Sequence, residues 1–273
     1  INKGIFCEII WGILYTSKVG KTMKFVFDLD GTICFKGQPL SAGIIAALES
    51  CLQNGHEVIF ASARPIRDLL PILPESMHKF PMVGGNGAFV AVNGAIKEKV
   101  AFEGQIVEDI KHIITAYQLA YLVDGEWDYA FTGSETHPIY QNLDPLKLAK
   151  QVTLQELKDI VKIVLFPGAH HLEIVAQLQK LPISIYEHAS ENIIDISPSG
   201  INKWTGLEKL GVEQNQFIAF GNDANDASMF VKALDSVCVG AHEVSQLATL
   251  QVPSEETAVI EMIQRLNYLS ASH

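Results

Sequence analysis

The stretch KFVFDLDGTI, residues 24–33, joins a short apolar run to two aspartates, Asp28 and Asp30. A fully apolar run that ends in Asp and Gly is typical of a buried parallel strand. Asp and Gly are also ordinary turn residues, so the two acids have a purely structural interpretation. The stretch therefore predicts a strand of a parallel sheet, and the rest of the sequence decides whether its acids also carry chemistry.

The composition is that of a globular protein: 273 residues, 48% hydrophobic and 19% charged, with a formal net charge of −11. This acidic excess argues against a nucleic-acid partner, because proteins that bind nucleic acids usually present a basic surface. It is compatible with a phosphate ligand, since a divalent cation and a few placed bases reverse the sign locally. The four cysteines show no C-x-x-C spacing, which indicates free thiols in a reducing cytosol: Cys7, Cys34, Cys51 and Cys238.

Residues 1–22 stand apart from the pattern that follows them. Their apolar stretch IFCEIIWGILY, residues 5–15, is too short to span a bilayer and has no small-residue cleavage site after it. We interpret residues 1–22 as an upstream extension before a natural start at Met23. The prediction is a cytoplasmic protein without a membrane partner.

From Met23 onward, apolar strands alternate with helices. Ser41 is placed to cap a helix that ends near Gly55, residues 57–63 form the next strand, and residues 67–74 form a short helix broken by Pro71. The pattern returns near the end, with strands at 216–223 and 236–240, helices at 202–210 and 226–234, and closing helices at 241–250 and 255–269. Such alternation predicts an α/β fold, a Rossmann-like doubly wound parallel sheet covered by helices on both faces.

The middle of the chain, residues 89–196, has a different pattern. Its strands are longer, and ISIYEHA, residues 183–189, alternates with period two, which favours an antiparallel sheet with one solvated face. We therefore predict an α+β cap domain at 89–196, inserted into a core made of residues 23–88 and 197–273. Candidates for substrate contact in the cap are Trp127, Asp128, Tyr129, His170 and His171, although packing or solvated surface explains each of them as well.

Polar residues follow several predicted strands at the edge where ligands of doubly wound sheets bind. They are Asp28 and Asp30, Ser62 and Arg64, Asn86, and then Asn222, Asp223 and Asp226, with Lys203 at the start of a nearby helix. A carboxylate is a usable nucleophile toward phosphorus, and Mg²⁺ with a lysine offsets the repulsion between carboxylate and phosphate. An EF-hand starting at Asp223 is excluded, because Ser228 and Leu234 stand where Gly and Glu are required.

In these motifs the chain resembles the haloacid dehalogenase superfamily, in particular the Cof-type, subfamily IIB phosphatases with a type-2 cap. The resemblance implies that Asp28 is the nucleophile, Asp30 the general acid/base and a source of a main-chain ligand to Mg²⁺, and Ser62 of SAR, with Lys203, a phosphate-binding residue. It implies a small phosphorylated metabolite as partner, sugar phosphates first. The remaining expected site residues are Ala63 and Asn225 for phosphate, Asn222, Asp223 and Asp226 for the metal, and Gly31, Thr32, Arg64, Asn86 and Gly87 for substrate.

The fourth motif departs from the family pattern. The sequence GNDAND places Asn222 where the family usually has a metal-binding Asp. An amide oxygen still coordinates a hard cation, but the site loses one negative charge, and Asp223 is a possible substitute. This leaves two alternatives open beside a phosphatase: a ligand-binding or regulatory protein with little turnover, and a phosphomutase. A receiver-like phosphoacceptor ranks last, because such domains are shorter and lack an inserted cap.

Overall fold

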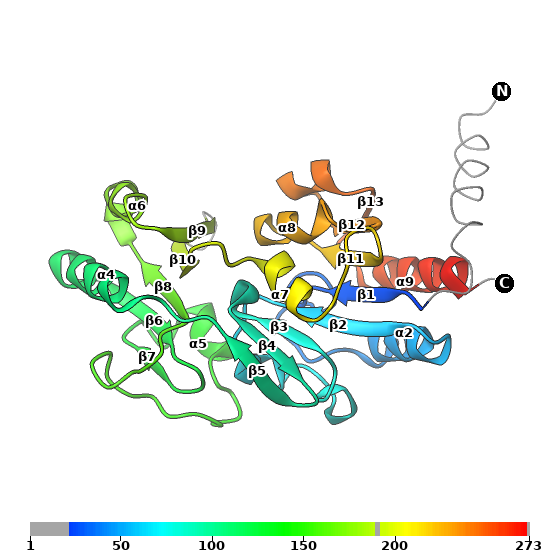
Figure 1. The fold of residues 1–273 in the computed structure, drawn as a ribbon, viewed down its shortest axis with the longest axis horizontal. Helices are drawn as coiled ribbons and strands as arrows, with labels where there is room; N and C mark the ends of the chain where they lie inside the picture. Colours follow the sequence, from blue (N-terminus) through cyan, green and yellow to red (C-terminus); the bar gives the residue numbers. More distant parts are fainter. Residues whose placement is uncertain (1–21, 189–191, 272–273) are drawn as a thin grey trace.

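The computed structural model describes residues 22–188 and 192–271. The expectation for residues 1–22 therefore falls, except for its last residue, outside the described part of the chain. Two sheets organise the described residues: an eight-stranded sheet, which we call the core sheet, and a five-stranded sheet, which we call the cap sheet. They lie in different parts of the molecule, as the ribbon in Figure 1 shows.

The core sheet has the order β13-β12-β11-β1-β2-β3-β4-β5. Six of its strands are parallel, and β4 and β5 continue it in antiparallel fashion. The strands are β1 (Lys24–Phe27), β2 (Glu57–Ala61), β3 (Met82–Gly84), β4 (Phe89–Val92), β5 (Ala95–Lys99), β11 (Phe217–Gly221), β12 (Asp235–Val239) and β13 (Leu250–Val252). The predicted parallel α/β core is thus confirmed.

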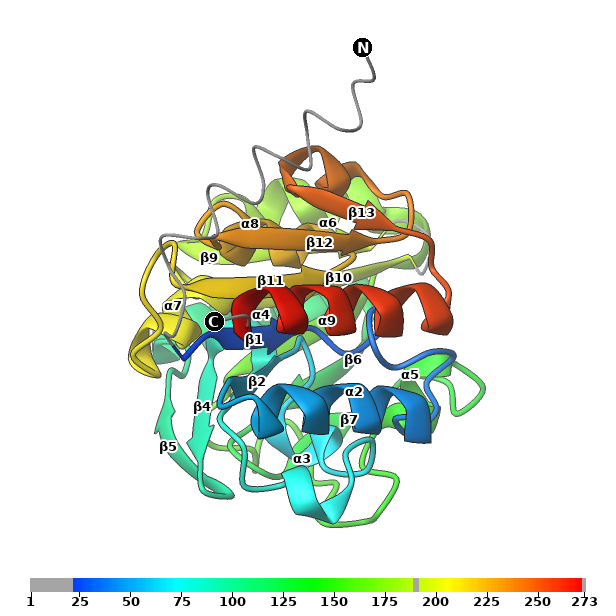
Figure 2. The ribbon, with the colours of Figure 1, turned by 90° about the vertical axis from the view of Figure 1, so that its right-hand side faces the viewer.

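Period-two alternation along β1 divides the core into two layers. Phe25 and Phe27 pack on the face covered by α2 (Ala42–Gln53) and α9 (Glu256–Ala271), which lie side by side in Figure 2. Val26 points to the opposite face, against α7 (Lys203–Lys209) and α8 (Ala227–Phe230). Because both faces are covered, the strands read as continuous apolar runs. Shorter helical elements connect the strands: α3 (Ile66–Leu69), η1 (Glu75–Met77), η2 (Gly85–Gly87), η4 (Ala224–Asp226) and η5 (Glu243–Leu247).

The cap sheet has the order β7-β6-β8-β10-β9 and is antiparallel throughout. Two helices, α4 (Gly104–Tyr117) and α6 (His171–Leu178), bury their apolar stripes on one face of it. The other face carries α5 (Pro138–Asn142) along part of its length. The remaining elements are β6 (Ala120–Asp124), β7 (Tyr129–Phe131), β8 (Lys162–Phe166), η3 (Gly168–His170), β9 (Ile183–His188) and β10 (Ile193–Pro198).

Two expected boundaries are wrong. The insertion does not begin at residue 89, because β4 and β5 pair with β3 and extend the core sheet to Lys99. Residues 241–250 do not form a closing helix; they form the short η5 and enter β13, which pairs with β12. The edge strands in these two places, β5 and β13, are short and have too few apolar residues to show a strand pattern.

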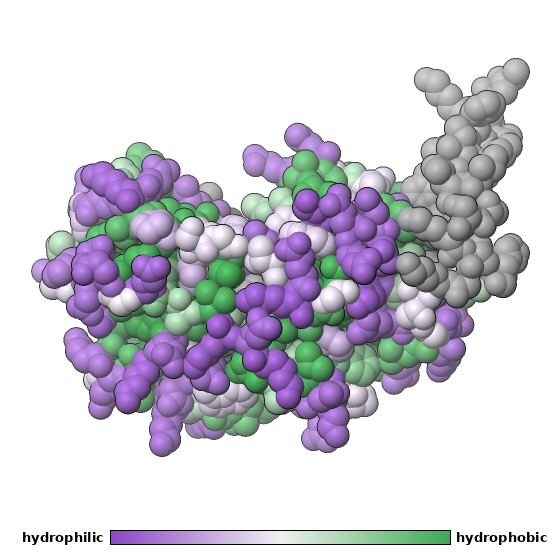
Figure 3. Space-filling view, in the orientation of Figure 1, coloured by the Kyte–Doolittle hydropathy of each residue, from purple (hydrophilic) through white to green (hydrophobic). Residues whose placement is uncertain are grey.

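The structure also bears on the state of the cysteines and on the predicted absence of a membrane span. Cys34, Cys51 and Cys238 are free and buried, as predicted, and Cys7 lies outside the described residues. Within the described ranges, no helix combines the length and the apolar character needed to cross a bilayer. Figure 3 shows hydrophilic residues spread over both the cap and the core, with hydrophobic patches between them.

Candidate active site

Lys203 and two aspartates form the buried centre of the site. Asp28 follows β1, Asp226 ends η4 after β11, and Lys203 is the first residue of α7. The ammonium Nζ of Lys203 donates to Asp28 Oδ1 at 2.7 Å and to Asp226 Oδ1 at 2.6 Å. Parallel strands bring their carboxyl ends to one edge of the sheet, which explains how residues about two hundred positions apart meet.

Burial makes the charged forms of all three groups at the centre costly, so each depends on its neighbours for its charge. Burial raises the pKa of Asp28 to about 7, while the Lys203 ammonium opposes that rise and the Asp226 carboxylate adds to it. The two carboxylates in turn raise the pKa of Lys203, although burial alone lowers it. Lys203 is therefore held as a cation, and Asp28 depends on positive charge nearby for its own negative charge.

The oxygens around Asp28 fit a magnesium ion. The hydroxyl of Thr32 lies 2.9 Å from Asp28 Oδ2 and 3.4 Å from Asn222 Oδ1, so these two oxygens border the same small space. Within the described part of the chain, no cluster of three or more His, Cys, Asp or Glu side chains is suited to a metal. A cation here needs the Asn222 amide and a main-chain carbonyl, such as that of Asp30, beside Asp28. All are hard oxygen ligands of the kind Mg²⁺ prefers.

Gly31 makes room for Asn222. Its φ is +72°, in the left-handed region that favours glycine, and a Cβ atom there would lie 2.2 Å from Asn222 Nδ2. The DG step of the opening motif thus has a second purpose beyond the turn. It lets the fourth motif approach the first closely enough for both to border one ion.

Both carboxylate oxygens of Asp226 accept hydrogen bonds inside the site. Its Oδ1 accepts from Lys203, and its Oδ2 accepts from the main-chain N–H groups of Asn222 and Asp223, at 2.8 and 3.0 Å. Asp226 is fully buried, and its hydrogen bonds hold the main chain of the fourth motif in place. Asp223 lines the cavity, and its Oδ1 accepts from the N–H of Ala224 at 2.7 Å.

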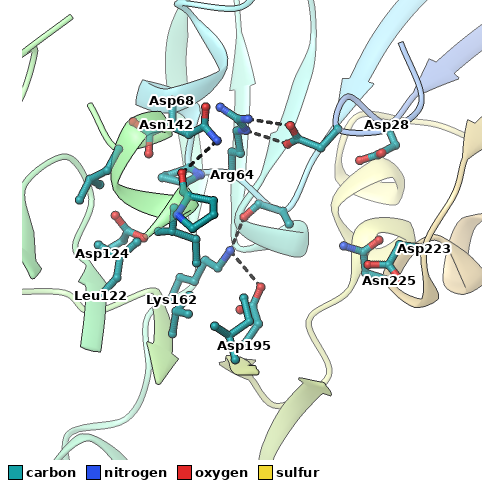
Figure 4. Close-up of a pocket in the computed structure, with 18 of the residues that line it drawn as sticks. Asp28, Arg64, Asp68, Leu122, Asp124, Asn142, Lys162, Asp195, Asp223 and Asn225 are labelled. Carbon is teal, nitrogen blue, oxygen red and sulfur yellow. Dashed lines mark hydrogen bonds and ion pairs between the residues drawn. The ribbon is translucent and has the colours of Figure 1, made fainter. Parts of the chain in front are cut away.

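Asp30 forms a two-bond ion pair with Arg64. Arg64 Nε donates to Asp30 Oδ2 at 2.7 Å, and Nη2 donates to Oδ1 at 2.6 Å (Figure 4). Ser62, after β2, is buried and its Oγ accepts from the N–H of Arg64 at 3.1 Å, while Ala63 and Arg64 line the cavity. In this arrangement both carboxylate oxygens of Asp30 are bonded to Arg64.

The NGA turn joins the core centre to the cap. Asn86 Oδ1 accepts from Asn225 Nδ2 at 3.2 Å, and Asn86 Nδ2 donates to Asp195 Oδ2 of β10 at 3.3 Å. At Gly87, with φ +110°, a Cβ atom would lie 2.1 Å from the carbonyl oxygen of Asn202, the residue that caps α7. Gly87 therefore belongs to the packing that places Lys203 rather than to the cavity wall.

A cavity of about 410 Å³ extends from these groups to the cap sheet (Figure 4). Its cap wall is the face of the sheet opposite α4 and α6, and it uses alternate residues of three strands: Leu122 and Asp124, Lys162 and Val164, and Ile193 and Asp195. Lys162 Nζ donates to the carbonyl oxygen of Ala63 at 2.7 Å and lies 3.0 Å from Asp195 Oδ2. Residues of the cap thus touch the SAR motif directly.

Sequence reasoning missed Lys162, Asp195, Asp124 and Asp68, and its own cap candidates lie elsewhere. Trp127, Asp128, Tyr129, His170 and His171 do not line the cavity. Trp127 donates to the carbonyl of Leu148, and the two histidines pair with Glu173 and Glu187. A charged residue in an otherwise apolar strand, as in KIVLF and IIDIS, marks these positions in the sequence, but it does not say which face of the sheet they occupy.

Comparison with protein families gives a match over most of the chain. Residues 25–263 match the sequence model of the haloacid dehalogenase-like hydrolases. A 5-amino-6-(5-phospho-D-ribitylamino)uracil phosphatase of Bacillus subtilis is 24% identical, covering 86% of this chain and 94% of its own length. An HMP-PP phosphatase of Yersinia enterocolitica is 24% identical (90% and 95%), and a phosphoglycolate phosphatase of Methanosarcina mazei is 26% identical (83% and 89%).

Solved structures show the same fold. A sugar phosphatase of subclass IIB of the haloacid dehalogenase superfamily superposes with a TM-score of 0.76 at 18% identity, covering 90% of this chain and 99% of its own. A haloacid dehalogenase-like hydrolase of Bacteroides thetaiotaomicron gives 0.73 at 20% identity, with 90% and 100% covered. The α/β core with an additional antiparallel sheet is therefore the architecture expected from the sequence.

Proposed function

Because the chain belongs to the family of haloacid dehalogenase-like hydrolases, we propose that it is a Mg²⁺-dependent phosphatase of small phosphorylated metabolites, sugar phosphates above all. The observation that carries the proposal is the contact of Lys203 with Asp28 beside the Asn222 oxygen, at the end of a cavity between core and cap. Three relatives named as phosphatases of different small phosphate esters support the reaction class.

In this proposal Asp28 performs the covalent step. One of its carboxylate oxygens bonds to phosphorus as the bond from phosphorus to the leaving oxygen breaks, which gives an aspartyl-phosphate. Lys203 offsets the negative charge that gathers between carboxylate and phosphate, with Ser62 and Asn225 as further phosphate contacts. Asp28, Asn222 and the Asp30 carbonyl would hold Mg²⁺, which would supply the remaining positive charge when bound.

Asp30 handles the proton in both halves of the reaction. It gives a proton to the leaving oxygen, then takes one from the water that attacks the aspartyl-phosphate and releases inorganic phosphate. For this its carboxyl group must leave Arg64, whose guanidinium then faces the substrate from the cavity wall. The exchange of partners between Arg64 and Asp30 couples substrate entry to the proton transfer.

The test is phosphate release from a panel of sugar phosphates, nucleotides and phosphorylated vitamins, with and without Mg²⁺. We expect Mg²⁺-dependent release that falls by roughly a thousandfold or more in Asp28→Asn, because the amide cannot form the intermediate. Asp109→Asn on α4, a partly exposed carboxylate that accepts from Gln105, is the matched control and should keep wild-type rates.

Two results would overturn the proposal. One is wild-type phosphate release by a folded Asp28→Asn protein. The other is no release of phosphate from the whole panel by the wild-type protein in millimolar Mg²⁺, which would favour the ligand-binding alternative suggested by Asn222. Isomerised sugar phosphate in place of free phosphate would identify a phosphomutase.

A further inference from the structure

The end of the cavity farthest from Asp28 has a chemistry of its own. Figure 4 separates Asp28, Asp223 and Asn225 on one side from Leu122, Asp124 and Asp68 on the other, with Lys162 and Asp195 between them. If Asp28 attacks phosphorus, as proposed above, the leaving group points toward Lys162, Asp195, Asp124 and Asp68. We call these four residues the distal wall. Their charges and free hydrogen-bonding positions then select the substrate.

The distal wall has more negative than positive charge. Asp68 and Asp124 share one guanidinium, because Arg67 donates to Asp68 at 2.8 and 2.9 Å and to Asp124 at 2.9 Å. Lys162 pairs with Asp195 alone. Among the described residues of the distal wall and the arginine behind it, three carboxylates face two cations. Burial also raises the pKa of Asp124, although the Arg67 guanidinium opposes that rise.

A hydrogen-bond acceptor without a partner provides an independent observation. Asp195 lines the cavity and is 3% exposed, and its Oδ1 accepts no hydrogen bond from any described residue. A buried acceptor without a donor costs about 1–3 kcal/mol, so a ligand that supplies donors gains by meeting it. A carboxylate or phosphate has no donor to supply.

The space between these polar groups is apolar. Leu122, Val164 and Ile193 of the cap sheet and Ile139 and Leu143 of the α5 region line it. A leaving group that carries donors on a compact skeleton with a carbon face satisfies both parts of the wall. A leaving group that carries several charges matches neither the polar nor the apolar part of the wall.

We infer that the distal wall selects phosphate esters whose leaving group carries amino or hydroxyl donors and no second anionic group. The inference rests on the proposed phosphatase function and narrows its substrate class. Among phosphorylated metabolites of similar size, amino sugars and polyols are then favoured over sugar acids and bisphosphates.

The experiment compares matched pairs of substrates: phosphoethanolamine with phosphoglycolate, and glucosamine 6-phosphate with 6-phosphogluconate. We expect kcat/KM to be at least tenfold higher for the amino member of each pair. Equal values, or a preference for the carboxylate member, would overturn the inference. The same pairs are titrated into the Asp28→Asn protein by calorimetry, so that a binding preference is measured even if the proposed hydrolysis fails.

Variants assign the preference to the distal wall. Asp195→Asn leaves Lys162 without its counter-charge, and we expect the ratio of amino to carboxylate substrate to fall at least tenfold through a gain on the carboxylate member. Asp124→Asn serves as a second variant should the first not fold, with a change in the same direction. Asp109→Asn, outside the cavity, removes the same charge and should leave the ratio unchanged. An unchanged ratio of amino to carboxylate substrate in both wall variants would contradict the inference. The proposed phosphatase function is tested separately, by whether hydrolysis of p-nitrophenyl phosphate depends on Asp28.

Discussion

At the residue scale, the site depends on one buried ammonium. Lys203 is fully buried and its charge is balanced by Asp28 and Asp226, which are buried as well. Breaking a buried ion pair by removing one partner usually costs about 3–5 kcal/mol, because the remaining charge loses both water and its counter-ion. Lys203→Met should therefore lower the free energy of unfolding by about that amount, and it should abolish phosphate release. Urea unfolding followed by circular dichroism measures the first effect.

Lys209→Met is the matched control for this prediction. It removes the same charge from the same helix, but Lys209 is partly exposed and lies 3.5 Å from Glu98, an exposed partner. Surface pairs contribute about 0–1 kcal/mol. Equal losses in the two variants would show that helix α7, rather than the buried charge, determines the result.

The proposed role of Asn222 as a Mg²⁺ ligand gives a prediction at this scale. Asn222→Asp adds a negative charge beside Asp28, so we expect the Mg²⁺ affinity to rise about tenfold or more and the melting temperature to rise with Mg²⁺ concentration. Asn222→Ala should remove the response. Thermal unfolding across a Mg²⁺ titration measures this without reference to turnover, and an Asp variant with unchanged Mg²⁺ affinity would contradict the assignment of Asn222 as a ligand.

The sequence predicts the residues around Asp28 well because each follows a strand as a polar interruption. Asp28, Asn222, Asp226 and Lys203 do meet, and Asp226 holds Lys203 and the main chain. Lys162 and Asp195 were not predicted, since a charge inside an apolar strand has no local sign of which face it occupies. That face is fixed only when the helices of the cap cover the other side of the sheet.

At the element scale, local signals determine the helices better than the sheet edges. Ser41 caps α2 as predicted: its side chain accepts from the N–H of Ile44 and donates to Glu256 of α9 at 2.7 Å. Strands β5 and β13 lie at the two edges of the sheet, have partly exposed residues, and are held in the sheet by pairing with β4 and β12. A strand pattern read locally does not contain that information.

The same contact gives a prediction for the α2–α9 pair. Ser41→Ala removes the helix cap and the bond to Glu256, so the free energy of unfolding should fall by about 1–2 kcal/mol with no change in phosphate release. Ser41→Thr keeps both bonds and should restore most of the loss. Urea unfolding of the three proteins measures the series; a Thr variant as unstable as the Ala variant would show that shape, not capping, matters at this position.

At the scale of the whole molecule, Arg67 ties the cap to the core. It belongs to α3 of the core, is 1% exposed, and donates to Asp124 and to the carbonyl oxygen of Trp127 in the cap, with its guanidinium 4.9 Å from the centre of the Tyr129 ring. Lys162 makes the reverse connection, from the cap to Ala63. These buried polar contacts join cap and core beside the cavity, while each part has its own hydrophobic core.

Arg67→Met should release the cap without unfolding the core. The substitution leaves Asp68 and Asp124 buried without their shared cation, and separation of cap from core lets water reach both carboxylates. We expect a larger radius of gyration in small-angle X-ray scattering and faster proteolysis in the connecting segments 100–103 and 199–202, where the chain passes between the sheets.

The double variant Arg67→Met with Asp124→Asn should recover part of the protection from proteolysis, because it removes one of the uncompensated charges. Lys111→Met, an exposed cation of α4 paired with Glu108, is the control and should behave as the wild type. If Arg67→Met instead kept the wild-type radius and cleavage rate, apolar packing rather than this ion pair would be what holds cap and core together.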